Sequence, residues 1–276
     1  MLSGPRSTRL PPMTHPLPTP RELVGVVHLG PLPGAPGWRG DFAGLLARAA
    51  ADAHALHAGG LRRAIVENFG DRPFFKERVP AETVAALALA VGHVAERVPG
   101  LELGLNVLRN DARAALGLAA VLPLRFVRIN VHVGAMVTDQ GLIEGQAAET
   151  LRERQRLCPQ VELWCDVHVK HALPLAGEDL IEAARNTLER GLADALILSG
   201  RATGSPPEGR DLARVRAACP GARLYLGSGL SVGNAAELLV HADGAIVGTS
   251  LKRGAHVDQP VDPKRVRALV AAVARL

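Results

Sequence analysis

Polar side chains alternate with apolar ones in two short segments of this chain, and their types could support acid–base or metal chemistry. Residues 161–170 read VELWCDVHVK, with an apolar residue at every odd position. Because side chains of a strand alternate between its two faces, the even positions share one face. The apolar odd positions suit packing against helices, so we expect the even positions to point into the interior of the fold. These are Glu162, Trp164, Asp166, His168 and Lys170. Residues 125–132 follow the same pattern and add Arg128, Asn130 and His132 to that face.

Two chemistries fit these residues together with His28, Glu67 and Asn106, which end other apolar segments. In the first, a divalent metal ion polarises a carbonyl or an enediolate, and the predicted ligands are His28, Glu67, Asp166 and His168. In the second, a carboxylate is the general base, a histidine is the acid, and Lys170 is an electrostatic partner or a Schiff-base amine. The predicted catalytic set is Glu67, Asn106, Asn130, His132, Asp166, His168 and Lys170. A hydrogen-bonded network that only fills the interior is the alternative, since buried polar groups need partners.

The last three apolar segments end in glycine and hydroxyl residues instead. Residues 199–204 read SGRATG, residues 227–229 read GSG, and residues 248–250 read GTS. Glycines let backbone N–H groups approach an anion, and barrel enzymes often bind phosphate after their last two strands. The predicted phosphate-binding residues are Ser199, Gly200, Gly227, Ser228, Gly229, Gly248, Thr249 and Ser250.

The segment 134–141, GAMVTDQG, has a glycine at each end and no regular periodicity. It is a candidate lid that closes over a ligand, with Thr138, Asp139 and Gln140 at its centre, or else an ordinary surface loop.

These residues need elements that bring them together, and the chain alternates short apolar runs with amphipathic stretches throughout. Such alternation is typical of βα units around a parallel sheet. The predicted strands are 23–28, 62–68, 101–107, 125–132, 161–168, 194–199, 223–227 and 243–248. The predicted helices are 41–58, 80–97, 111–120, 146–157, 177–190, 208–218, 232–240 and 263–275. Eight of each predict an α/β fold, a single (β/α)₈ barrel over residues 21–276, preceded by a flexible proline-rich tail at 1–20.

Composition narrows the class of protein further. The chain of 276 residues is 47% hydrophobic and only 3% aromatic, which suits an aliphatic barrel better than a base-stacking nucleic-acid module. The net charge of +5 comes from arginines spread among acids, so we expect no nucleic-acid partner. Three cysteines without a CxxC pair predict a reducing, cytoplasmic setting, and no apolar run is long enough for a transmembrane segment. No GxGxxG follows the first strand, which favours a closed barrel over an open doubly wound sheet. We expect no nucleotide cofactor.

With these motifs assembled, the chain resembles the BtpA family, whose namesake is a photosystem I biogenesis factor. The resemblance extends from Val24 to Gly254. It is carried by VHLGPLPG at 27–34, ENFGD at 67–71, GLNVLRN at 104–110, RINVHVG at 128–134, TDQG at 138–141, DVHVKH at 166–171, and residues 243–252. It implies a barrel of the ribulose-phosphate-binding group and names no reaction.

Two functions follow as hypotheses. The first is an isomerase, lyase or hydrolase that acts on a small phosphorylated metabolite through its carboxylates and histidines, with or without a divalent metal. The second is a non-catalytic assembly factor for a membrane protein complex, as in the family's namesake. Both leave a homo-oligomer open.

Overall fold

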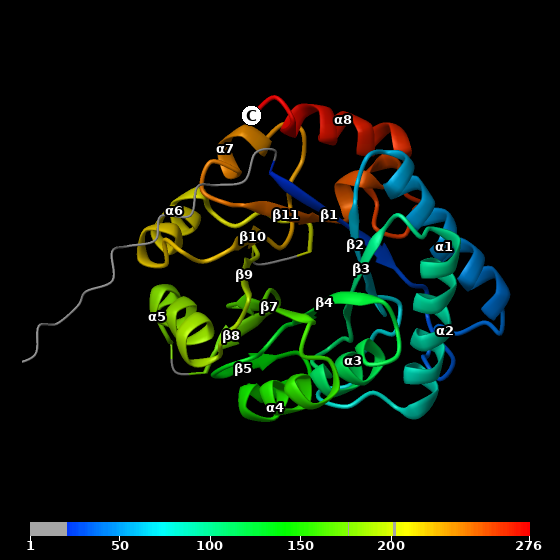
Figure 1. Ribbon diagram of the computed structural model, residues 1–276, viewed down its shortest axis with the longest axis horizontal. Helices are drawn as coiled ribbons and strands as arrows, with labels where there is room; N and C mark the ends of the chain where they lie inside the picture. The colour runs from blue at the N-terminus through cyan, green and yellow to red at the C-terminus, as the bar shows by residue number, and fades with distance from the viewer. Residues whose placement is uncertain (1–20, 176, 201–202) are drawn as a thin grey trace, which may run out of the picture.

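The computed structural model describes residues 21–175, 177–200 and 203–276, and its centre is a closed barrel of eight parallel strands (Figure 1). The predicted tail at 1–20, together with Arg201 and Ala202 of the predicted SGRATG segment, lies outside the described residues. Around the barrel the strand order is β1, β2, β3, β4, β7, β9, β10 and β11, and β11 pairs with β1 to close it. The predicted (β/α)₈ fold is therefore confirmed.

Each of the eight predicted strands forms, and each differs from its predicted bounds by no more than a few residues. The barrel strands are β1 (Glu22–His28), β2 (Arg63–Glu67), β3 (Glu102–Asn106), β4 (Leu124–Ile129), β7 (Glu162–Val167), β9 (Ala195–Leu198), β10 (Leu224–Leu226) and β11 (Gly244–Val247). The largest difference is at β4, which ends at Ile129 rather than at residue 132.

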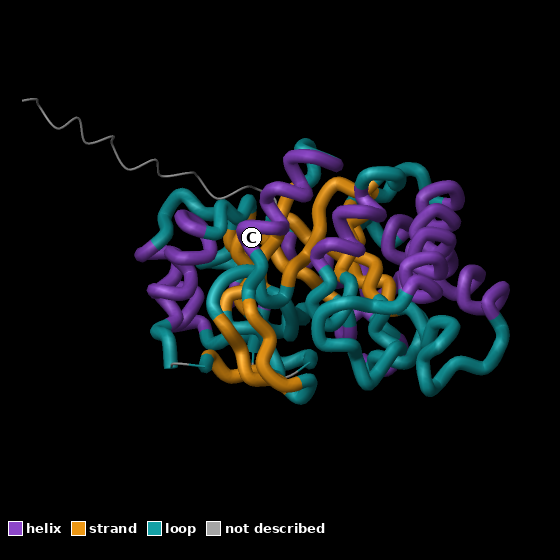
Figure 2. The backbone as a smooth tube through the Cα atoms, turned by 90° about the horizontal axis from the view of Figure 1, so that it is seen from below, coloured by secondary structure: helices purple, strands orange, loops and turns teal. Residues whose placement is uncertain are grey.

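Helices surround the strands on the outside, as Figure 2 shows in purple around orange. They are α1 (Phe42–Ala58), α2 (Ala81–Arg97), α3 (Ala112–Ala119), α4 (Ala147–Leu157), α5 (Leu180–Arg185), α6 (Gly209–Ala218), α7 (Ala235–Leu238) and α8 (Pro263–Val273). A π-helical turn (Asn186–Arg190) continues α5, and short 3₁₀ turns occupy Thr249–Leu251 and Arg253–Ala255. Four helices begin after an aspartate that accepts a backbone N–H of the first turn, which stabilises the helix start. These aspartates are Asp41, Asp111, Asp179 and Asp262.

The barrel interior is filled in layers, so it is a packed core and not a channel. At mid-height, Trp164 stacks between Phe126 and Tyr225, with ring centroids 4.1 and 4.3 Å apart. Small residues make room for these rings: a Cβ on Gly104 would lie 2.3 Å from the Phe126 ring. Outside the barrel, a larger aliphatic core fills the space between the sheet and the helices. Polar groups are thus confined to the two ends of the barrel.

A second, antiparallel sheet lies beside the carboxyl ends of β4 and β7, and the sequence did not predict it. It consists of β5 (Ala135–Thr138), β6 (Gly141–Glu144) and β8 (Ala172–Pro174), in the order β6–β5–β8. The segment 134–141 is thus the first arm and the turn of a hairpin rather than an irregular loop. Met136 and Ile143 pack with Val131 and Val169 underneath it.

Candidate active site

Two adjoining cavities open at the carboxyl ends of the barrel strands, the end where barrel enzymes place their sites. One has a volume of about 320 Å³ and lies against the loops after β10 and β11. The other, of about 870 Å³, lies against the loops after β2, β3 and β7. The residues that line both are Glu67, Arg128, Lys170, Thr203, Thr249 and Ala255. The two cavities therefore lie side by side and share these lining residues.

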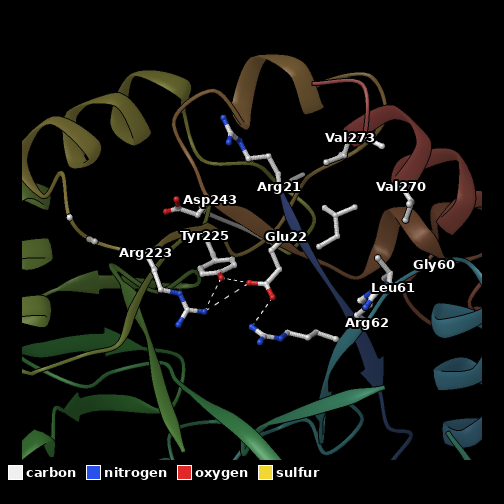
Figure 3. A pocket seen from close by; sticks show the side chains of 15 residues that line it. Arg21, Glu22, Gly60, Leu61, Arg62, Arg223, Tyr225, Asp243, Val270 and Val273 are labelled. Atoms are coloured by element: carbon white, nitrogen blue, oxygen red, sulfur yellow. Dashed lines mark hydrogen bonds and ion pairs between the residues drawn. The ribbon is translucent and has the colours of Figure 1, made fainter. Parts of the chain in front are cut away.

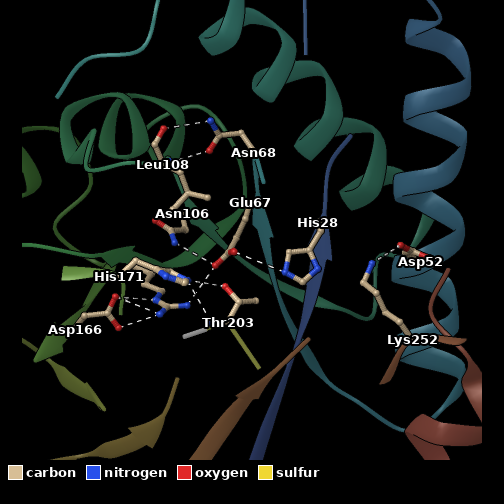
Figure 4. Close-up of polar contacts among 11 residues, drawn as sticks. His28, Asp52, Glu67, Asn68, Asn106, Leu108, Asp166, His171, Thr203 and Lys252 are labelled. Carbon is tan, nitrogen blue, oxygen red and sulfur yellow. Dashed lines mark hydrogen bonds and ion pairs between the residues drawn. The ribbon is translucent and has the colours of Figure 1, made fainter. Parts of the chain in front are cut away.

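Arg128 of β4 forms the floor between the cavities, and its charge is balanced by two buried carboxylates. Its guanidinium donates to both oxygens of Asp166, with Nη2 3.0 Å from Oδ1, and lies 3.4 Å from Oε1 of Glu67 (Figure 4). Asn130 donates a further hydrogen bond of 2.5 Å to Asp166. Burial lowers the pKa of Arg128, but the two carboxylates outweigh it and the net shift is upward, so this arginine stays charged.

Arg128 lies between two of the four predicted metal ligands. A metal ion held by Glu67 and Asp166 would need the space between these carboxylates, which the guanidinium fills. Across the described ranges, no group of three or more His, Cys, Asp or Glu side chains is arranged to hold a metal ion. Of the four predicted ligands, His28 and Glu67 lie 3.9 Å apart. The four residues therefore do not form a metal site.

His28 at the end of β1 and Glu67 at the end of β2 form the pair best placed for proton transfer. His28 Nε2 lies 3.9 Å from Glu67 Oε2, and both side chains line the smaller cavity. The other carboxylate oxygen, Oε1, accepts hydrogen bonds from Asn106 and Arg128, so the orientation of Glu67 is fixed. Burial lowers the pKa of His28 well below its usual range, and the charge of Lys252 acts in the same direction. The imidazole is therefore neutral at neutral pH, and its buried Nδ1 has no partner within the described chain.

Lys170 and Arg109 give the mouth an excess of positive charge. Lys170 lines both cavities, and its ammonium makes no hydrogen bond or ion pair with any described residue. Burial and the neighbouring Arg128 lower its pKa. Arg109, only 5% exposed, donates one bond of 2.7 Å to the carbonyl of Lys170, while its buried Nε has no partner in the described part of the chain. The sequence prediction included Lys170 but missed Arg109, which lies in the loop after β3 where no periodicity marks it.

Asn68 fixes the loop that carries Arg109. Its side chain bonds both backbone groups of Leu108, accepting from the N–H at 2.7 Å and donating to the carbonyl at 3.3 Å (Figure 4). The amide also donates to Asp71, whose other oxygen accepts the N–H of Leu32. The loops after β1, β2 and β3 are thereby tied together, and Arg109 is held on a rigid support.

The loops after β10 and β11 contain most of the residues predicted to bind phosphate. Their free donors are mainly backbone N–H groups rather than side-chain hydroxyls. Gly227, Ser228, Gly229, Gly248, Thr249 and Ser250 all line the smaller cavity. The hydroxyls of Ser228 and Ser250 donate to the carbonyls of Ser205 and Leu230, so they are already engaged. The N–H groups of Ser228, Gly229, Thr249 and Ser250 make no hydrogen bond to a described residue. Ser199 and Gly200 lie below the cavity, where Gly200 packs against the backbone of Ser205 and Pro206.

Two of the predicted catalytic histidines point elsewhere. The strands end earlier than predicted, at Ile129 and Val167, so the alternation of faces does not continue to His132 and His168. His132 bonds the carbonyl of Gly191, next to the π-helical turn, at 2.7 Å. His168 has a φ of 51° and lies near the acids Glu178 and Asp179. The prediction that these two side chains face into the barrel is wrong.

Asp166 and the predicted lid residues need a more limited correction. Asp166 does face inward, but its side chain has no exposed surface and lies beneath Arg128 and Asn130, so its position suits holding Arg128 better than acting as a base. In the hairpin turn, Thr138 bonds Gly141 and Gln140, and Gln140 bonds Asp139. Only Asp139 of these three reaches the larger cavity.

A third cavity, of about 640 Å³, lies at the opposite end of the barrel (Figure 3). Glu22 is at its centre and pairs with Arg63 at 2.7 Å, with Arg223 at 4.0 Å and with the hydroxyl of Tyr225. Arg223 and Arg63 also pair with Glu162 and Glu102, at 2.8 and 2.7 Å. These charges satisfy one another, in contrast to those at the mouth.

The similar solved structures share the fold at low sequence identity. Thiamine phosphate pyrophosphorylase from Pyrococcus furiosus aligns with a TM-score of 0.58 and 11% identity, covering 93% of this chain and 97% of that one. Phosphoribosyl anthranilate isomerase from Thermus thermophilus aligns with a TM-score of 0.56 and 15% identity, covering 92% and 98%. At such identities these likenesses establish the barrel fold alone.

Relatives by sequence span almost the whole chain. The photosystem I biogenesis protein BtpA of Synechocystis is 46% identical over 256 residues, which cover 93% of this chain and 89% of that protein. A Thermococcus kodakarensis protein is 44% identical, covering 91% and 94%. No helix in the described ranges is long and apolar enough to cross a membrane. The sequence pattern of the BtpA family matches residues 19–275, and the chain belongs to the BtpA family.

Proposed function

We propose that the protein is an enzyme that moves a proton on a small phosphorylated carbonyl compound, as an isomerase or a lyase does. The observation that carries this proposal is the pair His28 and Glu67, fixed and buried beside a cavity that the loops after β10 and β11 line.

The phosphate would lie against the loops after β10 and β11. Four residues that line this cavity have backbone N–H groups without a described acceptor, and such groups can bind anions through fixed dipoles. Lys170 lines the same cavity and adds a positive charge. The hydroxyls of Ser228 and Ser250 support the loops rather than the ligand, because both donate to carbonyls of neighbouring segments.

Glu67 is the proposed base and neutral His28 the proposed acid. A carboxylate removes a proton next to a carbonyl, and the resulting oxyanion needs a positive group beside it. Lys170 lines both cavities and can supply that charge. No step requires a metal ion, since Arg128 already stands between the carboxylates as a fixed cation.

Exchange of carbon-bound hydrogen in D₂O tests the proposal before the product is known. A set of phosphorylated ketoses and aldoses, with dihydroxyacetone phosphate and ribulose 5-phosphate among them, is incubated with the protein and followed by proton NMR. We expect exchange next to the carbonyl of at least one compound, and its loss in Glu67→Gln. Exchange at the wild-type rate in Glu67→Gln, or none with compounds that do bind, contradicts the proposal.

An assembly role is the second candidate, and the 46% identity to the Synechocystis photosystem I biogenesis protein favours it. This role needs no proton transfer at the mouth. Binding to a partner complex that survives a joint Glu67→Gln and His28→Asn substitution, in a protein without exchange activity, would support it over the enzyme proposal.

A further inference from the structure

We propose that Arg109 binds a carboxylate of the same ligand in the larger cavity. The substrates are then phosphorylated carbonyl compounds that also carry a carboxylic acid. This inference rests on the proposed function, because it assumes that the phosphate occupies the smaller cavity.

Arg109 is a buried positive charge held in place by the fold, and not a surface charge. Its side chain is 5% exposed, lines the larger cavity, and has no carboxylate within ion-pair distance in the described chain. One donor is used by the Lys170 carbonyl, and the buried Nε is left without a partner. A buried guanidinium without a counter-ion is costly, and a bidentate carboxylate is the ligand that fits its planar donors.

The charges around the cavity call for an anion of this kind. Arg128 is balanced by Glu67 and Asp166, so its charge is not available. Burial lowers the pKa of Arg109, while Asp166 and then Asp139 act in the opposite direction. Asp166 is engaged by Arg128, and Asp139 in the hairpin turn is exposed and lines the same cavity. Arg109 and Lys170 therefore remain as two positive charges that no described carboxylate pairs. A phosphate at one end and a carboxylate at the other would satisfy both.

The support of Arg109 is consistent with a recognition role. Asn68 bonds both backbone groups of Leu108, and the N–H of Arg109 itself donates to the carbonyl of Phe75 at 3.1 Å. A guanidinium on such a rigid loop is held in place before the ligand arrives, which lowers the entropy lost on binding.

Matched pairs of ligands test the proposal by calorimetry with the full chain. The acids are 3-phosphoglycerate, 4-phosphoerythronate and 6-phosphogluconate, and their partners are glycerol 3-phosphate, erythritol 4-phosphate and sorbitol 6-phosphate. We expect at least one acid to bind tenfold or more tightly than its matched alcohol. In Arg109→Met this ratio should fall to about one, while the affinity for the alcohol stays unchanged.

Two further variants keep the test decisive if Arg109→Met does not fold. Asp139→Asn removes the competing acid without touching the interior, and it should raise the affinity for the acids severalfold and leave the alcohols unchanged. Arg62→Met, an exposed arginine at the opposite end of the barrel, is the control and should change neither.

The outcomes separate the two proposals. Equal binding of acids and alcohols, or an acid preference that survives Arg109→Met, overturns the carboxylate site and leaves the phosphate site standing. If fructose 1,6-bisphosphate binds more tightly than 6-phosphogluconate and this preference is lost in Arg109→Met, the group bound at Arg109 is a second phosphate, and the carboxylate proposal is overturned. Failure of every phosphorylated compound and of inorganic phosphate to bind overturns the proposed function and this inference with it.

Discussion

The two ends of the barrel hold similar residues and use them differently. At the amino-terminal end, Glu22 pairs with Arg63 and Arg223, and these two arginines also pair with Glu102 and Glu162. At the carboxyl-terminal end, Lys170 and Arg109 are left without acidic partners among the described residues. A cavity lined by charges is therefore a weak guide to function by itself. Charges that the folded chain leaves unpaired are the better guide, because only they gain by binding a ligand.

The largest expected difference between the two ends is in activity. Glu67→Gln should lower the rate of hydrogen exchange by about 10²- to 10⁴-fold, the usual contribution of a positioned acid or base. Glu22→Gln should leave that rate unchanged, since the described partners of Glu22 lie at the amino-terminal end of the barrel, away from the mouth. Rates measured by NMR under identical conditions check this, and equal losses in the two variants would break the comparison.

The largest expected effect on stability is at the floor of the mouth. Arg128→Met leaves Glu67 and Asp166 as buried carboxylates without a cation, and the free energy of unfolding should fall by about 3–5 kcal/mol. Arg125→Met on the same strand is the control, because Arg125 is exposed and pairs loosely with Glu102 at 3.8 Å. Urea unfolding measures both, and similar losses would show that Arg128 is not the balancing charge.

Ligand affinity should depend on pH through Lys170. Burial lowers the pKa of Lys170, and binding of an anion needs its charged form. Affinity for a phosphorylated ligand should therefore decline as the pH rises, and the decline should come below the ordinary lysine range of about 10.4. In Lys170→Arg the decline should move to higher pH. Calorimetry across this range is the measurement, and an unmoved profile would assign the decline to another group.

The smallest expected effect is at the amino-terminal end. Tyr225→Phe removes a hydroxyl that contacts Glu22 and Arg223 and should cost about 1 kcal/mol of unfolding free energy. Ligand affinity should not change. A change in affinity would mean that the two ends are coupled through the stack of aromatic rings.

Much of this architecture could be predicted from the sequence, because alternation and helical periodicity report burial directly. The eight strands and eight helices form as predicted, and Asp166 lies on the inner face of its strand as the alternation predicts. Periodicity fails where a strand ends. The polar alternation continues through His132 and His168 in the sequence, but the strands stop before them and the backbone turns.

The rest of the site depends on long-range pairing that no local pattern encodes. No local pattern marks Lys252 as buried, yet it is 1% exposed and pairs with Asp52 of α1 at 3.4 Å. Arg109 follows no periodic element, and its position comes from bonds that Asn68 makes across two strands. The metal prediction treated the carboxylates as free, whereas Arg128 occupies the space between them.

The aromatic stack inside the barrel has a consequence for optical measurement. The chain has two tryptophans. Trp164 lies fully buried between Phe126 and Tyr225, whereas Trp38 lies half-buried after β1, in the lining of a small cavity that His28 also borders. Trp164 should therefore emit at short wavelength, and its emission should not change when a ligand binds. The emission of Trp38 should change when a ligand binds near His28. A Trp164→Phe variant would leave Trp38 as a single fluorescent reporter, and ligand binding could be read from it without a label.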